Sequence, residues 1–522
     1  MTKFFIGVFF AGAVFINIAT INDGHNWGDD FAQYILCAQN ILNHKTYGSG
    51  IMLENPYSYP PGFPFLIAPI IKFFGVNFVI LKLINILFWY LSVLVLYPLF
   101  VQRLGRERAV LSCLFLAYSA NLFFYKQNVL SDIPFFFFFS SAITVFTLSC
   151  DKKLSDTALV KSGTFLVFLV VLMAGTLIRS AGYVVCLSTV IYLVFIKKYW
   201  KAALLTIMTA GVTAIVQSRY VLKGPGFLSY AFGHIREFVS TIIPVLSTPL
   251  KSLVLLLCPD STVLTGSIYN FIEPMITFLA PVIYFVMTCV VIQKFRKRTL
   301  SYLGCFTFLY LIIFLFWTGF DPNPRTLVRL AYPLFVPALL MMAIAAKKVS
   351  PAWKKPPLAK QPIAFKTFLY LLIFLNTFNI ASAYQFNDDV VLKPQNQELF
   401  HWVRDNLKEE DRYIFQAPRA LALFTHRVGA PPMVKYSPRN EDLIERAVRL
   451  DIAYVILVKP VDVELVHFFD THEFIAVGVW ENQYYKIYKM QNFTAPDPTH
   501  ATAVFPRLAL SAHPGDSINF EF

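Results

Sequence analysis

The sequence predicts a polytopic α-helical membrane protein with a small α/β domain at its C-terminal end. Two observations predict the membrane part. Of the 522 residues, 57% are hydrophobic and 53 are Phe, whereas soluble domains are about 45–50% apolar. These residues also gather in runs long enough to cross a bilayer. The α/β domain is predicted because short helical and strand patterns replace the long apolar runs beyond residue 385.

About eleven membrane spans are expected. The first, residues 4–21, is interpreted as a retained helix rather than a signal peptide, because no A-x-A-like cleavage site precedes Asn22 and further spans follow. The others are expected at residues 78–100, 109–125, 133–150, 164–178, 181–196, 202–222, 271–292, 300–319, 330–346 and 363–384. The seven Cys lie in or beside apolar segments without a C-x-x-C pair, so we interpret them as core residues.

Short runs of Lys and Arg predict the orientation of the spans. With this threading, the basic runs near residues 103–108, 152–153, 197–201, 294–298 and 347–355 all fall on one face. The positive-inside rule makes that face cytoplasmic. The protein is then expected in the inner (plasma) membrane with a cytoplasmic N-terminus. The same runs account for the formal charge of +14 without nucleic acid, since no basic stripe with stacking aromatics occurs on a soluble element.

The predicted domain boundaries follow from this threading. Residues 1–384 form the membrane domain, with extracytoplasmic loops at 22–77 and 223–270 and an amphipathic interfacial helix at 234–246. Residues 385–490 form the extracytoplasmic α/β domain, and 491–522 form a tail that is expected to be poorly ordered. Within the α/β domain we expect helices at 397–411 and 441–451, strands at 412–416 and 453–458, and a hairpin of 473–480 with 483–490.

Two adjacent carboxylates, Asp29 and Asp30, follow the first span. On a helix that begins near Asp29, apolar side chains fall on one side, while Asp30 and Gln33 fall on another. A single Asp here could simply cap the helix, which is worth about 1 kcal/mol. Two in tandem indicate that at least one faces an aqueous cavity. If Asp30 is held in a partly dry cavity, desolvation and its acidic neighbour are expected to raise its pKa.

Later segments place further charges on the same face. The stretch YSYPPGFPFLIAP, residues 57–69, is expected to be a shaped loop rather than a regular helix, with a Gly for close approach. Asp132 stands at the outer mouth of a span, where it could also cap that helix. Arg179 interrupts an apolar hairpin, which favours a buried role.

Arg325 and Arg329 stand where another span begins. A charge in hydrocarbon costs roughly 2.5–3.5 kcal/mol, so one near its edge needs a partner or a ligand. Arg329 is the stronger candidate for a ligand contact, with an interfacial anchor as the alternative. Of the two, Arg325 is the stronger candidate for a solvated side chain.

The order of these features resembles a known family. DDFAQY, YPPG, SDIP, an intramembrane Arg and the pattern R-x-x-x-P-x-x-x-P at Arg329, Pro333 and Pro337 follow one another along the chain. This ordered set resembles the polyprenyl-phosphate-sugar-dependent glycosyltransferases of the GT-C fold, in particular the bacterial relatives of protein O-mannosyltransferases and lipid A aminoarabinose transferases. The resemblance covers residues 1–489 and implies the GT-C fold.

The resemblance also implies roles for residues. Asp30, four residues before Tyr34, matches the catalytic base, with Asp29 as its near alternative, and Asp132 matches the second acid. Arg329, Arg179, Arg325, Tyr34 and Tyr59 are expected at the donor. In the aminoarabinose transferases, a Lys before the proline pair contacts donor phosphate. Tyr59 stands there in this chain, which weakens the case for a lipid A acceptor.

The expected function is transfer, with inversion, of a sugar from a polyprenyl-phosphate donor to an extracytoplasmic glycan, lipid or protein acceptor. Arginines can neutralise one phosphate, and the sequence has no His or Cys cluster, so no obligatory metal is expected. The alternatives are a lipid or sugar transporter or flippase, which would predict internal symmetry and acids at the midplane, and an envelope polysaccharide ligase or polymerase.

Overall fold

The computed structural model describes most of the chain. The described residues are 2–25, 29–53, 59–150, 163–220, 246–257, 263–297, 300–318, 327–349, 363–383, 390–432 and 443–491. The expected interfacial helix at 234–246 apart from residue 246, Arg325, and the tail apart from residue 491 lie outside them.

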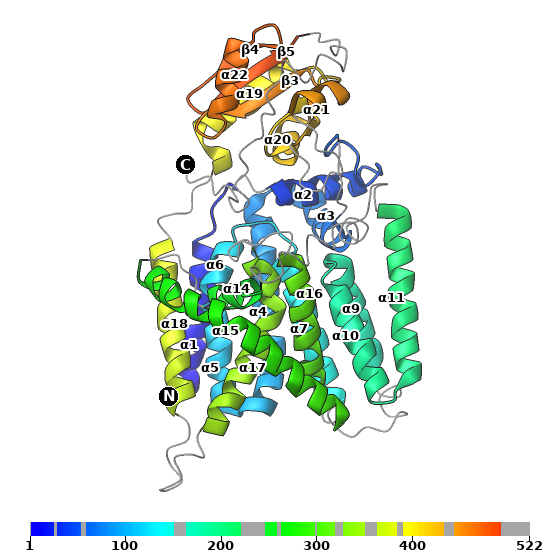
Figure 1. Ribbon diagram of the computed structural model, residues 1–522, viewed down its shortest axis with the longest axis vertical. Coiled ribbons are helices and arrows are strands. Elements are labelled where there is room, and N and C mark those ends of the chain that lie inside the picture. Colours follow the sequence, from blue (N-terminus) through cyan, green and yellow to red (C-terminus); the bar gives the residue numbers. More distant parts are fainter. Residues whose placement is uncertain are drawn as a thin grey trace.

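Apolar helices stand side by side in one bundle (Figure 1). A described helix, or a pair of consecutive helices, lies at each of the eleven expected spans. These elements are α1 (Thr2–Ala19), α4 (Phe78–Leu104), α5 (Arg106–Ala117) with α6 (Ala120–Tyr125), α7 (Asp132–Cys150), α9 (Thr164–Ile178), α10 (Gly182–Phe195), α11 (Tyr199–Tyr220), α15 (Val263–Arg296), α16 (Tyr302–Thr318), η1 (Val328–Ala331) with α17 (Tyr332–Val349), and α18 (Ile363–Ala383).

Length and composition identify spans among the described helices. Five segments are long and apolar enough to cross a membrane: α4, the α5–α6 segment, α7, α11 and α15. The protein is therefore membrane-embedded. Of the described cysteines, Cys37, Cys113, Cys186 and Cys305 are buried as expected. Cys289 is exposed, because its helix α15 leaves most of its apolar side chains outside the packed core.

Two shorter helices lie between the bundle and the C-terminal domain (Figure 1). They are α2 (Asp29–Leu42) and α3 (Gly62–Phe74), and a third short helix, α14 (Thr248–Leu257), packs against η1. The expectation of an irregular loop over residues 57–69 is wrong from Gly62 onward. The proline pair precedes α3, and Pro64 occupies the first helical turn, where a missing N–H costs little.

The glycine of the YPPG motif makes the expected close approach. A Cβ atom on Gly62 would lie 2.6 Å from the carbonyl carbon of Leu177, so no other residue fits without a shift of the backbone. The start of α3 is therefore pressed against the end of α9, directly before Arg179.

The C-terminal domain, called the sheet domain below, is a five-stranded mixed sheet with helices. The strands are β1 (Tyr413–Ile414), β2 (Gly429–Ala430), β3 (Tyr454–Val458), β4 (Ala476–Glu481) and β5 (Tyr485–Met490), in the order β2-β1-β3-β5-β4. The first three are parallel, and β3-β5-β4 is antiparallel. The helices are α19 (Pro394–Asn406), α20 (Pro418–Thr425), α21 (Leu443–Arg449) and α22 (Val463–Thr471), and a short turn η4 (Val390–Leu392) precedes them.

The expected hairpin, the two expected strands and the two expected helices of this domain are confirmed. Sequence patterns missed α20, β2 and α22, which are short. Every residue of β3 is buried, as expected for a central strand covered on both faces.

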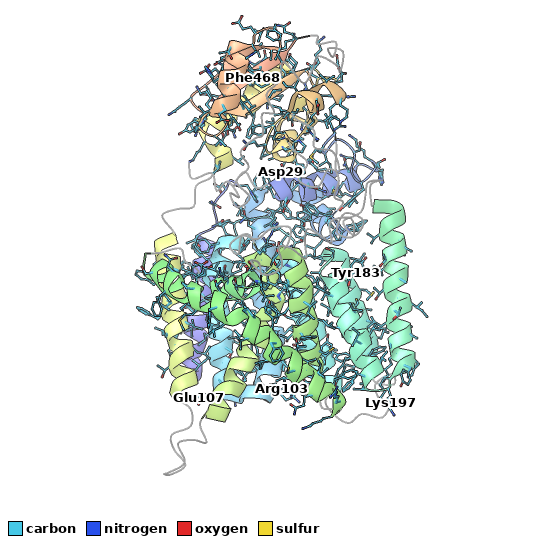
Figure 2. All side chains as sticks on the ribbon, viewed as in Figure 1. Asp29, Arg103, Glu107, Tyr183, Lys197 and Phe468 are labelled. Atoms are coloured by element: carbon cyan, nitrogen blue, oxygen red, sulfur yellow. The ribbon has the colours of Figure 1, made fainter. Side chains whose placement is uncertain are left out.

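Asp29 and the basic runs lie at opposite ends of the bundle. Figure 2 shows Asp29 at the end near the sheet, and Arg103, Glu107 and Lys197 at the far end. The orientation prediction requires Asp29 and the basic runs to be separated in this way.

Cysteine labelling from outside intact cells can test the orientation. In a background without native cysteines, a Cys at position 402 should react with a membrane-impermeant maleimide, and a Cys at position 297 should react only after permeabilisation. Both sites are in described segments. The reverse pattern would overturn the orientation.

Candidate active site

All the carboxylates and cations expected in the site except Arg325, which lies outside the described residues, come together in one cluster at the end of the bundle nearest the sheet domain. Asp30 pairs with Arg329, whose Nη1 lies 3.0 Å from Oδ2. Asp132 pairs with Arg179, whose Nη1 lies 2.7 Å from Oδ1. Four elements that are distant in sequence, α2, α7, the α9–α10 connection and η1, therefore contribute to one site.

Both oxygens of Asp30 have partners from the membrane domain. The Tyr59 hydroxyl donates to Oδ1 at 2.5 Å, and Arg329 donates to Oδ2. Burial alone would raise the pKa of Asp30, but the charges of Arg329 and Arg419 and the Tyr59 hydrogen bond outweigh burial and lower the pKa to about 2. The expectation of a raised pKa at Asp30 is therefore wrong, because guanidinium groups surround the carboxylate.

Asp29 has a different environment. Its Oδ2 lies 2.5 Å from Nε of Arg419, and its Oδ1 accepts from the backbone amide of Ala420 at 2.9 Å. Burial raises the pKa of Asp29, and the neighbouring charge of Asp30 adds to this, although both contacts with α20 lower it. The tandem acids thus have opposite pKa shifts and separate partners.

Asp132 holds Arg179 at the break between α9 and α10. The Asp132 side chain is only 2% exposed, against 16% for Arg179, and Arg179 also donates to Ser131 Oγ at 3.5 Å. Ser131 Oγ lies 2.8 Å from the Tyr34 hydroxyl. The alternative of a helix cap is not supported, because Asp132 is already the first residue of α7 and neither of its carboxylate oxygens accepts a hydrogen bond from the described residues.

Aromatic rings connect the two ion pairs. The Tyr34 ring stacks on Tyr59 at 4.9 Å between centroids and meets Phe63 edge-on at 5.0 Å. Tyr59 occupies the expected place at the site, where it bonds a carboxylate. These rings fix the position of the hydroxyl that contacts Asp30.

Arg329 is the most exposed cation of the cluster. Its side chain is 35% exposed, and it lies on η1, where the Tyr310 hydroxyl donates to the Leu330 carbonyl oxygen at 2.8 Å. A short turn held by a neighbouring helix therefore presents a guanidinium that solvent can still reach.

Arg419 is the site residue that sequence analysis missed. It comes from α20 of the sheet domain, and besides Asp29 it donates to Gln33 Oε1 and, at 3.5 Å, to the Tyr59 hydroxyl. Its Nη2 lies 3.8 Å from Asp30 Oδ1. A signal was present in PRALALF: a cation in the first turn of a helix opposes the helix dipole, so it needs an anion nearby.

Buried groups hold the segment that leads into α2. Lys82 of α4 donates to the Asn22 carbonyl and side-chain oxygens at 2.8 and 2.7 Å, and to the Gly24 carbonyl oxygen. His25 accepts from the Val129 amide at 3.0 Å and stacks on Phe31 at 3.7 Å. The acids therefore follow a segment that is tied to the bundle at several points.

Comparison with known proteins relates part of the chain to a family model. Residues 58–222 match the family model described as dolichyl-phosphate-mannose-protein mannosyltransferase, a segment that includes Tyr59, Asp132 and Arg179. The comparison with curated proteins found no match.

Two solved structures have a similar fold. One is the archaeal oligosaccharyltransferase AglB from Archaeoglobus fulgidus in complex with an inhibitory peptide and a dolichol-phosphate, with TM-score 0.55, 14% identity, and coverage of 95% of this chain and 75% of that chain. The other is ArnT from Cupriavidus metallidurans bound to undecaprenyl phosphate, with TM-score 0.53, 12% identity, and coverage of 94% and 98%. Both have the GT-C fold, so the fold expected from the sequence is confirmed.

Proposed function

We propose that this chain, which has the GT-C fold, is a membrane glycosyltransferase that moves a sugar from a polyprenyl-phosphate donor to a hydroxyl acceptor at the extracytoplasmic face. The 3.0 Å contact between Arg329 and Asp30 carries the proposal, because it puts a cation for a leaving phosphate beside a carboxylate that can take a proton. The polyprenyl phosphates bound to both structural neighbours support a donor of this class.

In the proposed reaction, the acceptor oxygen attacks the anomeric carbon of the sugar while the bond from that carbon to the phosphate oxygen breaks. The electron pair of that bond leaves with the polyprenyl phosphate, and the acceptor proton passes to Asp30. Attack opposite the leaving group inverts the anomeric carbon. With a pKa of about 2, Asp30 is ionised at neutral pH, as a base must be.

The remaining charges have supporting roles in this proposal. Arg329 neutralises the leaving phosphate, and Arg179, aimed by Asp132, assists it. Two guanidinium groups match the charge of one phosphate diester becoming a monoester, so we propose that no metal is obligatory. Asp29 lies at the end of the bundle near the sheet (Figure 2), and Asp30 follows it in α2, which favours a transferase over a transporter with acids at the midplane.

Donor turnover tests the function directly. Purified protein incubated with candidate polyprenyl-phosphate sugars and acceptors should release free polyprenyl phosphate, detected by mass spectrometry, and a chelator should leave the rate unchanged. Protein heated before the assay is the control. If no donor of this class is consumed and intact lipid-linked sugar instead crosses vesicle membranes, the chain is a flippase. Loss of turnover with chelator would remove the metal-independent mechanism.

A further inference from the structure

Arg419 joins the sheet domain to the acid pair of the membrane domain. Its helix α20 follows β1 at the carboxyl edge of the parallel strands, beside the point where the strand order reverses between β1 and β3. Open α/β sheets present their ligand-binding groups at this edge. In this chain the edge is turned toward Asp29.

Asp29 and α20 provide each other with hydrogen-bond and charge partners. The N-cap residue of α20, Ala417, makes no side-chain cap hydrogen bond, so amides of the first turn need another acceptor. The carboxylate of Asp29 accepts from the Ala420 amide at 2.9 Å. The same carboxylate neutralises Arg419, whose charge otherwise opposes the helix dipole.

The contacts divide the tandem acids between the two domains. Asp29 gives its oxygens to Arg419 and Ala420 of the sheet domain. Asp30 gives its oxygens to Tyr59 and Arg329 of the membrane domain. The hydrogen bonds of Asp29 therefore go to the sheet domain and those of Asp30 to the membrane domain. Arg419 spans both, because it also reaches Gln33 and Tyr59 and lies 3.8 Å from Asp30 Oδ1.

We propose that Arg419 is a positioning residue for the transfer reaction, which anchors the sheet domain on Asp29 and thereby fixes the direction in which Asp30 faces the acceptor. This inference rests on the proposed function. In this proposal the sheet domain is part of the active site. Asp29 anchors that domain, and Asp30 is the base.

Other contacts keep the domains together when Arg419 is replaced. The Leu53 amide donates to the Gly429 carbonyl oxygen at 2.9 Å, and the Val391 amide donates to the His25 carbonyl oxygen at 3.0 Å. The rings of Phe78 and Phe424 lie 6.3 Å apart. Arg419→Ala should therefore fold with its domains in place.

Arg419→Ala should lower kcat by about tenfold to a hundredfold, because small misplacement of a reacting group is costly, while the KM for donor stays near the parent value.

In the same variant, the acidic limb of the pH–rate profile should move to higher pH. A base acts only when ionised, and removal of a cation that lowers the pKa of both acids raises the pH at which activity is lost. Arg419→Lys should recover part of kcat, since Lys keeps the positive charge but lacks the planar guanidinium that donates several hydrogen bonds at once.

The matched control is Arg404→Ala, which removes an exposed Arg of the same domain that pairs with Asp405 at 3.4 Å. It should behave as the parent. A parental kcat and pH profile in Arg419→Ala would overturn the positioning role, because a purely structural role changes the amount of folded protein and leaves the pH profile in place.

Thermal unfolding separates this inference from the proposed function. Asp29→Asn and Arg419→Ala should each lower Tm, and the double variant should lose no more than the larger single effect, because the two residues act as a unit. Strictly additive losses would overturn the anchor. If the parent protein consumes no donor while the losses are non-additive, the proposed function fails and the anchor stands without a catalytic role.

Discussion

Asp30→Asn should lower the rate of sugar transfer by about 10²–10⁴, the range expected for removal of a general base. An Asn side chain keeps the shape of Asp, whose two oxygens now accept from Tyr59 and Arg329 at 2.5 and 3.0 Å. Its one carbonyl oxygen can accept from Arg329, and its amide group can donate to the Tyr59 hydroxyl oxygen. The variant should therefore fold, insert and bind donor. The measurement is turnover per folded molecule, with donor binding determined on the same preparation.

Two comparisons make this result specific. Asp470→Asn removes a carboxylate that pairs with Lys486 at 2.7 Å in the sheet domain, and it should transfer sugar at the parental rate. Asp132→Asn should have an intermediate rate, because it loosens Arg179 without removing the base. Loss of a helix cap alone would cost about 1 kcal/mol of stability with normal turnover. Near-normal rates in Asp29→Asn, Asp30→Asn and Asp132→Asn together would end the proposed mechanism.

Arg329→Ala should weaken donor binding and lower turnover by about 10²–10³, the loss measured when one donor of an anion-stabilising site is removed. The phosphate of the donor loses its most accessible cation, since Arg329 is 35% exposed and Arg179 only 16%. Lys should replace Arg329 poorly if the guanidinium engages two phosphate oxygens. Binding can be measured with a fluorescent polyprenyl phosphate, alongside turnover.

Lys251→Ala is the control for this prediction. Lys251 is a cation on the neighbouring helix α14, but it pairs with Glu273 at 2.8 Å, outside the cluster. It should bind donor as the parent does. Unchanged donor binding in Arg329→Ala would remove the phosphate role, and loss of folded protein in place of binding would indicate an interfacial anchor.

Local pattern was enough to predict most of the fold. Spans such as α4 and α7 are apolar runs of the length that a bilayer requires, and the β4–β5 hairpin consists of two runs rich in β-branched and aromatic residues that a short polar turn separates. The error at α3 has a physical cause: the pair in YPPG precedes the helix, Pro64 lies in its first turn, and the apolar helix accommodates Pro69 in its interior. The short elements β2 and α22 carry too few residues for a period to be evident.

The candidate site could also be predicted only in part from the sequence. Asp30, Asp132, Arg179 and Arg329 were predicted because each is a charge placed at the edge of an apolar segment, where it must have a partner. Which carboxylate each arginine meets depends on tertiary packing, and no spacing encodes it. Arg419 lies 390 residues from Asp29, in a domain whose orientation on the bundle the sequence does not specify. The pKa of Asp30 is lowered rather than raised for the same reason, because the arginines around it come from distant parts of the chain.

The ion pair between Arg329 and Asp30 also has a kinetic consequence under the proposed mechanism. While Arg329 and Tyr59 occupy both oxygens of Asp30, that carboxylate is a poor proton acceptor, and only a competing anion can draw the guanidinium away. The lipid phosphate is such an anion, so the lipid-linked sugar must enter before the hydroxyl compound can react. Initial-rate measurements should therefore show compulsory-order binding, with the donor before the acceptor. Without donor the site should be inactive, because Arg329 and Asp30 remain paired.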